Sequence, residues 1–64
     1  MNKLEKLVRH KLVIDVSIFK LGDFICLMLE TLNGESLKAC EKTLEKAIDS
    51  AENQLNELFS SDMN

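Results

Sequence analysis

The spacing of apolar residues changes near the middle of this 64-residue chain, and that change limits the folds open to it. Between Lys11 and Lys20 (KLVIDVSIFK) the side chains alternate with the two-residue period of a β-strand. Between Leu37 and Phe59 apolar residues recur every three or four positions, which is the period of an amphipathic helix. The two periods predict an α+β domain in which a strand region precedes a long C-terminal helix.

A β-hairpin is the predicted structure of the strand region, with strands at residues 11–20 and 24–32. Gly22-Asp23 lies between the two segments, and glycine supplies the positive φ that a type II′ turn needs at its first central position. The β-branched residues of the first segment also fit a pleated surface better than a helix. With a two-residue turn, Phe19 faces Cys26 across the hairpin.

The remaining segments complete a single domain over residues 1–64. The opening residues, MNKLEKLVRHK, are good helix formers and predict a short N-terminal helix. Asn33-Gly34 is a second turn signal, after which the chain forms either a short third strand at Ser36–Cys40 or the start of the helix. We expect the C-terminal helix from about residue 41 to residue 60, with Thr43 as one candidate N-cap.

An all-helical fold is the alternative. Apolar residues between Leu4 and Leu32 also fit the a and d positions of a heptad repeat, with Lys11 out of place. Asn33-Gly34 would then be the bend of a helical hairpin, and two such hairpins would form a dimeric four-helix bundle. The β-branched residues and a mid-helix Gly22-Asp23 argue against this fold.

The length of the chain predicts self-association. So short a chain buries only about 60% of its unfolded surface, so it usually needs a disulfide, a metal or oligomerisation. The single histidine and the two cysteines, Cys26 and Cys40, lack the spacing of a zinc site. Both cysteines have apolar neighbours, so we expect buried, reduced thiols, with one disulfide as the alternative. Oligomerisation is therefore the remaining way to stabilise so short a chain.

The surplus of apolar residues in the hairpin locates the predicted dimer surface. The C-terminal helix can cover one face of the hairpin, where we expect it to cover Ile14, Val16, Ile18, Leu27 and Leu29. The opposite face stays uncovered and is the predicted self-association surface: Phe19, Leu21, Phe24, Cys26 and Met28. An exposed apolar patch of this kind marks an interaction site. We therefore predict a homodimer or a higher homo-oligomer.

Charge is divided unevenly along the chain. Residues 1–20 hold five basic and two acidic side chains, residues 21–64 hold three basic and nine acidic ones, and the net charge is −3. An acidic balance argues against a general nucleic-acid-binding protein, which normally carries a basic face. The N-terminal segment still offers phosphate contacts through Lys3, Lys6, Arg9 and Lys11.

Catalytic and cofactor motifs are not recognisable in the sequence. Each glycine stands alone in a turn, so there is no phosphate loop. His10 is isolated, and Asp15 and Glu30, which lie opposite each other in the predicted hairpin, have no accompanying catalytic group. We expect no enzyme activity, no cofactor and no metal. Polar residues interrupt the apolar segments, so we also expect neither a signal peptide nor a membrane span, and a cytoplasmic protein.

Two resemblances bear on function. The strand–turn–strand region followed by ACEKTLEKAI, residues Ala39–Ile48, resembles the small antitoxin domains of the HicB type, in which a strand, a turn and a helix opening T-x-E-E-A follow one another. The usual aromatic and proline positions of that family are missing here. The chain length and the alternative helical hairpin are similar to those of Rop-type RNA-binding dimers.

By elimination, the predicted function is that of a small non-enzymatic regulator. It would act as a homodimer and bind another macromolecule, with a protein as the favoured partner, in the manner of an antitoxin-like inhibitor or a phage- or plasmid-type modulator. The alternative is a dimeric RNA- or DNA-binding regulator that uses the basic N-terminal segment.

Overall fold

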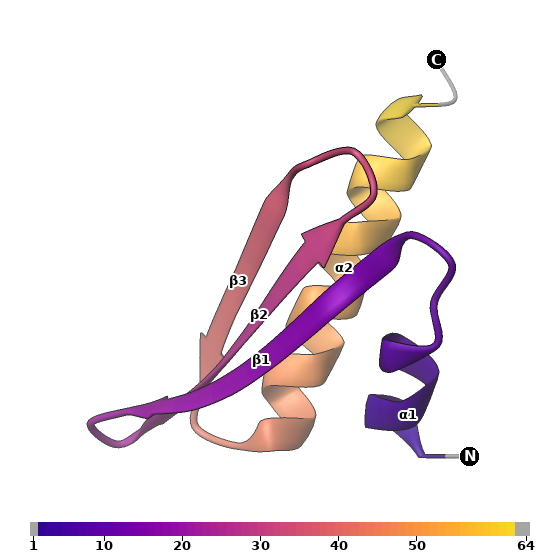
Figure 1. Ribbon diagram of the computed structural model, residues 1–64. Helices are drawn as coiled ribbons and strands as arrows, with labels where there is room; N and C mark the ends of the chain where they lie inside the picture. The colour runs from indigo at the N-terminus through magenta and orange to yellow at the C-terminus, as the bar shows by residue number, and fades with distance from the viewer. Residues whose placement is uncertain (1, 63–64) are drawn as a thin grey trace.

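The computed structural model describes residues 2–62, with side chains described for residues 2–58. Along the chain these residues form α1 (Lys3–Val8), β1 (Val13–Leu21), β2 (Phe24–Thr31), β3 (Ser36–Glu41) and α2 (Leu44–Asp62) (Figure 1). The strands form one antiparallel sheet in the order β1-β2-β3. Helix α2 packs against β2 and β3, and α1 packs against α2 and β1. The α+β prediction is confirmed with its third strand, and the all-helical alternative is wrong.

Side-chain caps fix where both helices begin. Asn2 is the N-cap of α1, and its Oδ1 accepts a hydrogen bond from the Glu5 N–H at 2.7 Å. Helix α2 begins at Leu44, later than the predicted residue 41, because the preceding residues extend β3. Thr43 caps it, since its Oγ1 accepts a hydrogen bond from the Lys46 N–H at 3.2 Å.

Glycines form the two turns of the sheet, as predicted. Gly22 has a φ of +60°, while Asp23 has no positive φ, which matches the two central positions of a type II′ turn. Gly34 has a φ of +83°, and its N–H donates to the Thr31 carbonyl at 3.0 Å in the β2–β3 turn. A side chain strains this left-handed backbone, so both positions favour glycine.

The hairpin has the predicted register at its turn and a bulge at its start. Phe19 lies opposite Cys26, as a two-residue turn requires. At the other end the register shifts between Val13 and Asp15, which leaves Ile14 as the extra residue of a β-bulge. Because of this shift, alternation counted back from the turn assigns Ile14 to the wrong environment.

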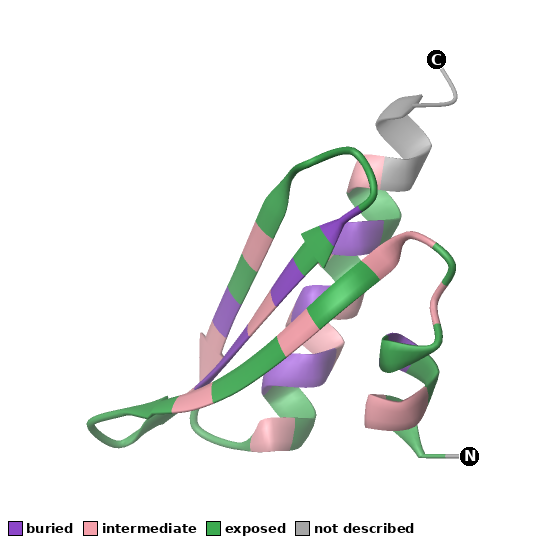
Figure 2. Ribbon diagram, viewed as in Figure 1, coloured by how far each residue is buried: buried purple, intermediate pink, exposed green. Residues whose placement is uncertain are grey.

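The hydrophobic core lies between the sheet and the helices. Its buried members come from α1, β2, β3 and α2: Leu7, Leu27, Leu29, Ala39, Ala47, Ile48, Ala51 and Leu55. Figure 2 shows these buried positions in purple on β2, β3 and the adjoining turns of α2. The α2 members belong to the apolar stripe predicted from the helical period. The side chain of Phe59, the last residue of that stripe, lies outside the described side chains.

Candidate interaction site

The sheet face that points away from α2, here called the outer face, holds the predicted self-association residues. Strand alternation and cross-strand pairing place all five on this face: Phe19, Leu21, Phe24, Cys26 and Met28. Leu21 is 57% exposed and Phe24 is 44% exposed, whereas Phe19 and Met28 are partly buried. In the described part of the chain, neither helix packs on this face. Its role in self-association stays a prediction.

Cys26 differs from the other four residues. It is fully buried and forms a disulfide with Cys40 on β3, so the expectation of reduced thiols is wrong, as is the expectation that Cys26 is exposed. The two cysteines are cross-strand partners with Cα atoms 4.0 Å apart, close to the spacing of about 4.5 Å in a non-hydrogen-bonded antiparallel pair. The four residues that remain at least partly accessible, called the outer-face patch below, are therefore Phe19, Leu21, Phe24 and Met28.

Polar side chains border the outer-face patch. The Nζ atom of Lys38 lies 5.7 Å from the centroid of the Phe19 ring, within cation–π distance. Asp15 and Glu30 are paired toward the other end of the hairpin, and both are exposed. An apolar centre with a polar border is the usual composition of a protein–protein interface.

Helix α2 covers less of the hairpin than the sequence suggested. Leu27 and Leu29 on β2 are fully buried and Val16 is partly buried, but Ile14 is 57% exposed and Ile18 is 46% exposed. The reason is that α2 packs over β2 and β3 and leaves β1 to the short helix α1. Apolar residues are therefore exposed along β1 as well as on the outer face.

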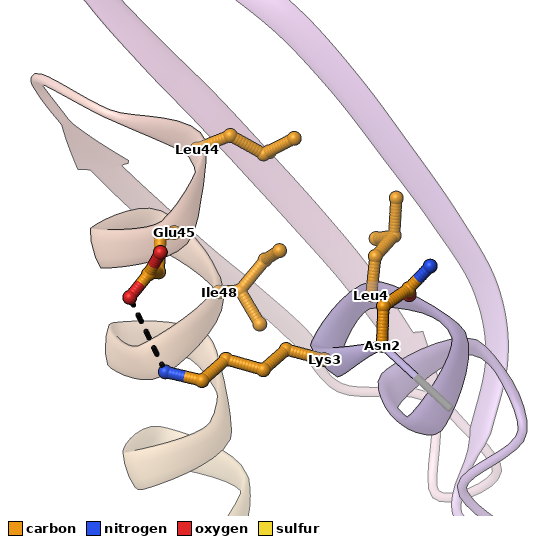
Figure 3. A pocket seen from close by; sticks show the side chains of 6 residues that line it. All are labelled: Asn2, Lys3, Leu4, Leu44, Glu45 and Ile48. Atoms are coloured by element: carbon orange, nitrogen blue, oxygen red, sulfur yellow. Dashed lines mark ion pairs between the residues drawn. The ribbon is translucent and has the colours of Figure 1, made fainter.

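A groove of about 540 Å³ lies between α1 and the first turns of α2 (Figure 3). Leu4 from α1 and Leu44 and Ile48 from α2 supply its apolar wall. At its rim, Lys3 Nζ forms an ion pair with Glu45 Oε1 at 3.6 Å. The apolar spacing in α1 predicts a buried helix face but not the element against which that face packs, so the groove could not be read from the sequence.

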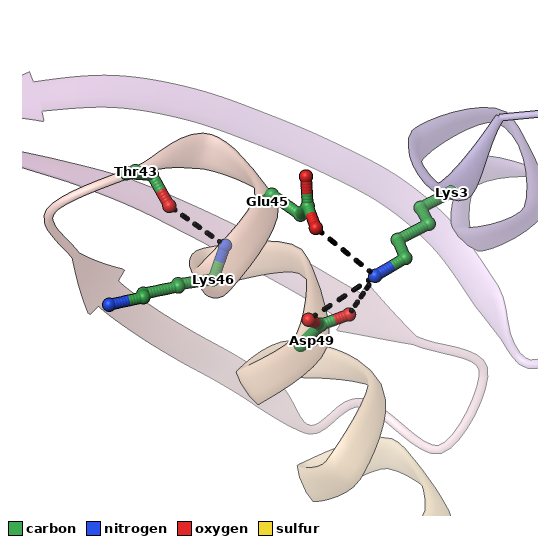
Figure 4. A network of polar contacts seen from close by, with 5 residues as sticks. All are labelled: Lys3, Thr43, Glu45, Lys46 and Asp49. Carbon is green, nitrogen blue, oxygen red and sulfur yellow. Dashed lines mark hydrogen bonds and ion pairs between the residues drawn. The ribbon is translucent and has the colours of Figure 1, made fainter.

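Lys3, the first predicted phosphate contact, is engaged with α2 (Figure 4). Its Nζ lies 3.1 Å from Asp49 Oδ1 and also pairs with Glu45. The hydrogen bond to Asp49, with the charges of both carboxylates, raises the pKa of Lys3 above its ordinary value of about 10.5. The ammonium group therefore links α1 to α2 across the surface.

The other predicted phosphate contacts have different surroundings. Arg9 Nη2 pairs with Glu5 Oε2 at 3.2 Å, one turn away on the same helix. Lys6 and Lys11 are exposed. Lys3 and Arg9 thus have carboxylate partners within the chain.

Metal ligands do not cluster in the described part of the chain, where no three His, Cys, Asp or Glu side chains lie together as a metal site would need. His10 instead accepts a hydrogen bond at Nδ1 from the Leu12 N–H at 3.1 Å. Among the described helices, none is long and apolar enough to cross a membrane.

Comparison with protein-family models, with curated proteins and with solved structures gives no match for this chain. At Ala39–Ile48, β3 leads through a short turn into α2, with Thr43 as the cap of the helix.

Proposed function

We propose that the chain is a small non-enzymatic interaction protein that acts as a homodimer and binds another macromolecule, in the manner of an antitoxin-like inhibitor or regulatory modulator. The observation that carries the proposal is the outer-face patch, which stays uncovered on a chain with a small core. Removing apolar surface from water contributes about 25 cal/mol per Å². The patch therefore favours association with a second apolar surface.

Two outer faces are suited to pair with each other. Leu21 and Phe24 are cross-strand neighbours, and Phe19 continues the patch along β1. A two-fold axis through the patch would set apolar residues of one copy against those of the other. Lys38 and Asp15 at the border would stay in contact with water. Such a dimer would supply apolar burial that the small monomer lacks.

A protein partner is favoured over a nucleic acid by the charges. The net charge is −3, and Lys3 and Arg9 already have carboxylate partners. A phosphate group would have to compete with these ion pairs. Nucleic-acid binding through Lys3, Lys6, Arg9 and Lys11 remains the alternative proposal, and its signature would be an affinity that falls steeply with salt.

Sedimentation equilibrium on three proteins tests the proposal. We compare wild type with Phe24→Asp, which puts a charge in the patch, and with Leu32→Asp, which puts the same charge on a residue that is 63% exposed in the β2–β3 turn. We expect wild type and Leu32→Asp to have the same molar mass, that of the associated protein. We expect Phe24→Asp to have half that mass and to keep the wild-type circular dichroism spectrum.

Binding to another macromolecule is tested with the same three proteins as immobilised baits. A partner that uses this surface should be retained by wild type and Leu32→Asp and lost from Phe24→Asp. A folded wild-type monomer at micromolar concentration, together with equal retention by all three baits, would contradict the proposal.

A further inference from the structure

The free edge of β1 is a second surface that the fold leaves open. In the part of the chain that the structure describes, β1 is at one side of the sheet and pairs with β2 alone. The two-residue turn makes Leu21 and Phe24 the closing pair of the hairpin. Ladder alternation then directs the backbone N–H and C=O groups of Val16, Ile18 and Lys20 toward the free edge.

Exposed apolar side chains line this edge. Val8 and Ile14 border a hollow of about 250 Å³ together with Val16, and Ile18 borders a second hollow with Leu44. Val8, Ile14 and Ile18 are among the exposed large apolar residues of the chain, and none belongs to the outer-face patch. They would stay exposed after the outer face was covered.

The middle of the edge carries few of the features that keep edge strands apart. Soluble proteins usually protect a long edge strand with lysines, prolines, bulges or a covering segment. Here the bulge lies at the start of β1, next to Asp15, and Lys20 lies near its end. The intervening residues 16–19 carry no charge, and the chain has no proline. The edge is therefore open to another strand.

We propose that β1 pairs with β1 of a second copy in antiparallel orientation, around a two-fold axis beside Ser17 and normal to the sheet. Ser17 is the midpoint of Val13–Leu21, so this register overlaps the whole strand. The axis keeps the outer faces of both copies on one side, and Val16 lies opposite the second copy's Ile18. The apolar side chains of Val16 and Ile18 from the two copies then lie side by side on the α2 side of the sheet. Two three-stranded sheets become one continuous sheet with all helices on one face.

Charge complementarity favours a second copy as the occupant. In this register the hairpin tip of one copy, with Asp23, lies beside the residues that precede β1 in the other copy. The run Arg9-His10-Lys11 carries two basic side chains, and Arg9 also pairs with Glu5 at 3.2 Å within its own copy. The two-fold axis repeats this contact at the other end of the strand pair. A shift of the register would separate the acidic tip from the basic run.

Edge pairing is independent of the proposed outer-face dimer. It uses outward backbone groups and side chains on the α2 side of the sheet, whereas the outer-face patch lies on the opposite side. A two-fold axis normal to the sheet and one parallel to it combine into a closed tetramer if they intersect, and into an open assembly of copies if they do not. Either interface alone gives a dimer, so the failure of one proposal can be told from the failure of the other.

A cysteine cross-link tests the register. In the proposed pair Ser17 faces Ser17 of the second copy at a non-hydrogen-bonded position, where the Cα atoms are about 4.5 Å apart. Ser17→Cys should therefore form a covalent dimer rapidly in a glutathione redox buffer. Ser36→Cys, which places a cysteine at an exposed position of β3, is the matched control. Cross-linking of Ser17→Cys no faster than that of Ser36→Cys would overturn the proposal.

Sedimentation equilibrium with Ile18→Lys tests the interface without a cross-link. We expect this variant to have half the mass of the wild type, and Leu32→Lys to keep the wild-type mass. If both interfaces form, wild type is a tetramer where the two axes intersect and a larger assembly where they do not, and Ile18→Lys and Phe24→Asp each give dimers. If Ile18→Lys keeps the wild-type mass, the proposal that β1 pairs with β1 of a second copy is wrong. That result is expected if only the outer faces pair, or if the edge takes a strand from another protein.

Discussion

Cys26 and Cys40 lie directly opposite each other on β2 and β3 and are joined by a disulfide. On its other side Cys26 is paired with Phe19 of β1, so the bridge lies next to the outer-face patch. The loop closed by the bridge spans a sequence separation of 14 and contains the Asn33-Gly34 turn. A covalent link thus holds together the strands that present the patch.

Removal of the bridge should destabilise the fold. Closing a loop of this length restricts the unfolded chain, and the double variant Cys26→Ala/Cys40→Ala should lose about 3 kcal/mol of unfolding free energy. Urea denaturation followed by circular dichroism measures the change. Reductant should produce a comparable loss in wild type and no change in the double variant. An unchanged urea midpoint in the double variant would show that the bridge does not stabilise the fold.

The oxidation state of the two cysteines in cells should indicate the cellular compartment of the protein. Disulfides persist in oxidising compartments and are rare in the cytoplasm, where thiols are kept reduced. The cytoplasmic location expected from the sequence therefore predicts that Cys26 and Cys40 are free thiols in growing cells and pair after purification in air. Rapid acid quenching, alkylation under denaturing conditions and mass spectrometry distinguish the two states. Recovery of the disulfide in the acid-quenched sample would contradict a cytoplasmic location.

Loss of the Thr43 cap should weaken α2 at its start. The Thr43 hydroxyl accepts the Lys46 N–H, one of the amide groups that the first turn of a helix cannot satisfy itself. Thr43→Ala should lower the unfolding free energy by about 1 kcal/mol, while Thr43→Ser, which keeps the hydroxyl, should change it little. Thermal unfolding of the three proteins checks this. Equal losses in both variants would show that the hydrogen bond is not the cause.

Local signals in the sequence predicted most of the fold. The glycine at position 22 fixed the turn, and with it the cross-strand pairing of Phe19 with Cys26. The apolar period of α2 identified the helix face that is buried. These features depend on residues close together in the chain. Strand alternation counted from the turn also correctly predicted that the outer-face residues share one face of the sheet.

The errors concern relations between distant segments. The bulge at Ile14 depends on how the start of β1 meets the end of β2, and a one-residue shift changes which face a side chain occupies. Pairing of Cys26 with Cys40 required β3, which the sequence left as one of two alternatives. The exposure of Ile18 follows from the strands that α2 covers, and the helical period says nothing about that choice.

The ion pairs of Lys3 should make the docking of α1 sensitive to alkaline pH. The hydrogen bond to Asp49 raises the pKa of Lys3 in the folded protein. The Lys3 ion pairs therefore stabilise the fold fully at pH values below the ordinary lysine pKa of about 10.5, and this stabilisation is lost as the pH rises through the raised pKa. Lys3→Met should therefore have a slightly lower melting temperature than wild type at neutral pH, since exposed pairs contribute little. The difference should vanish at strongly alkaline pH. Lys6→Met, on the same helix, is the control, and an identical pH dependence in both variants would rule out the Lys3 pairs as the cause.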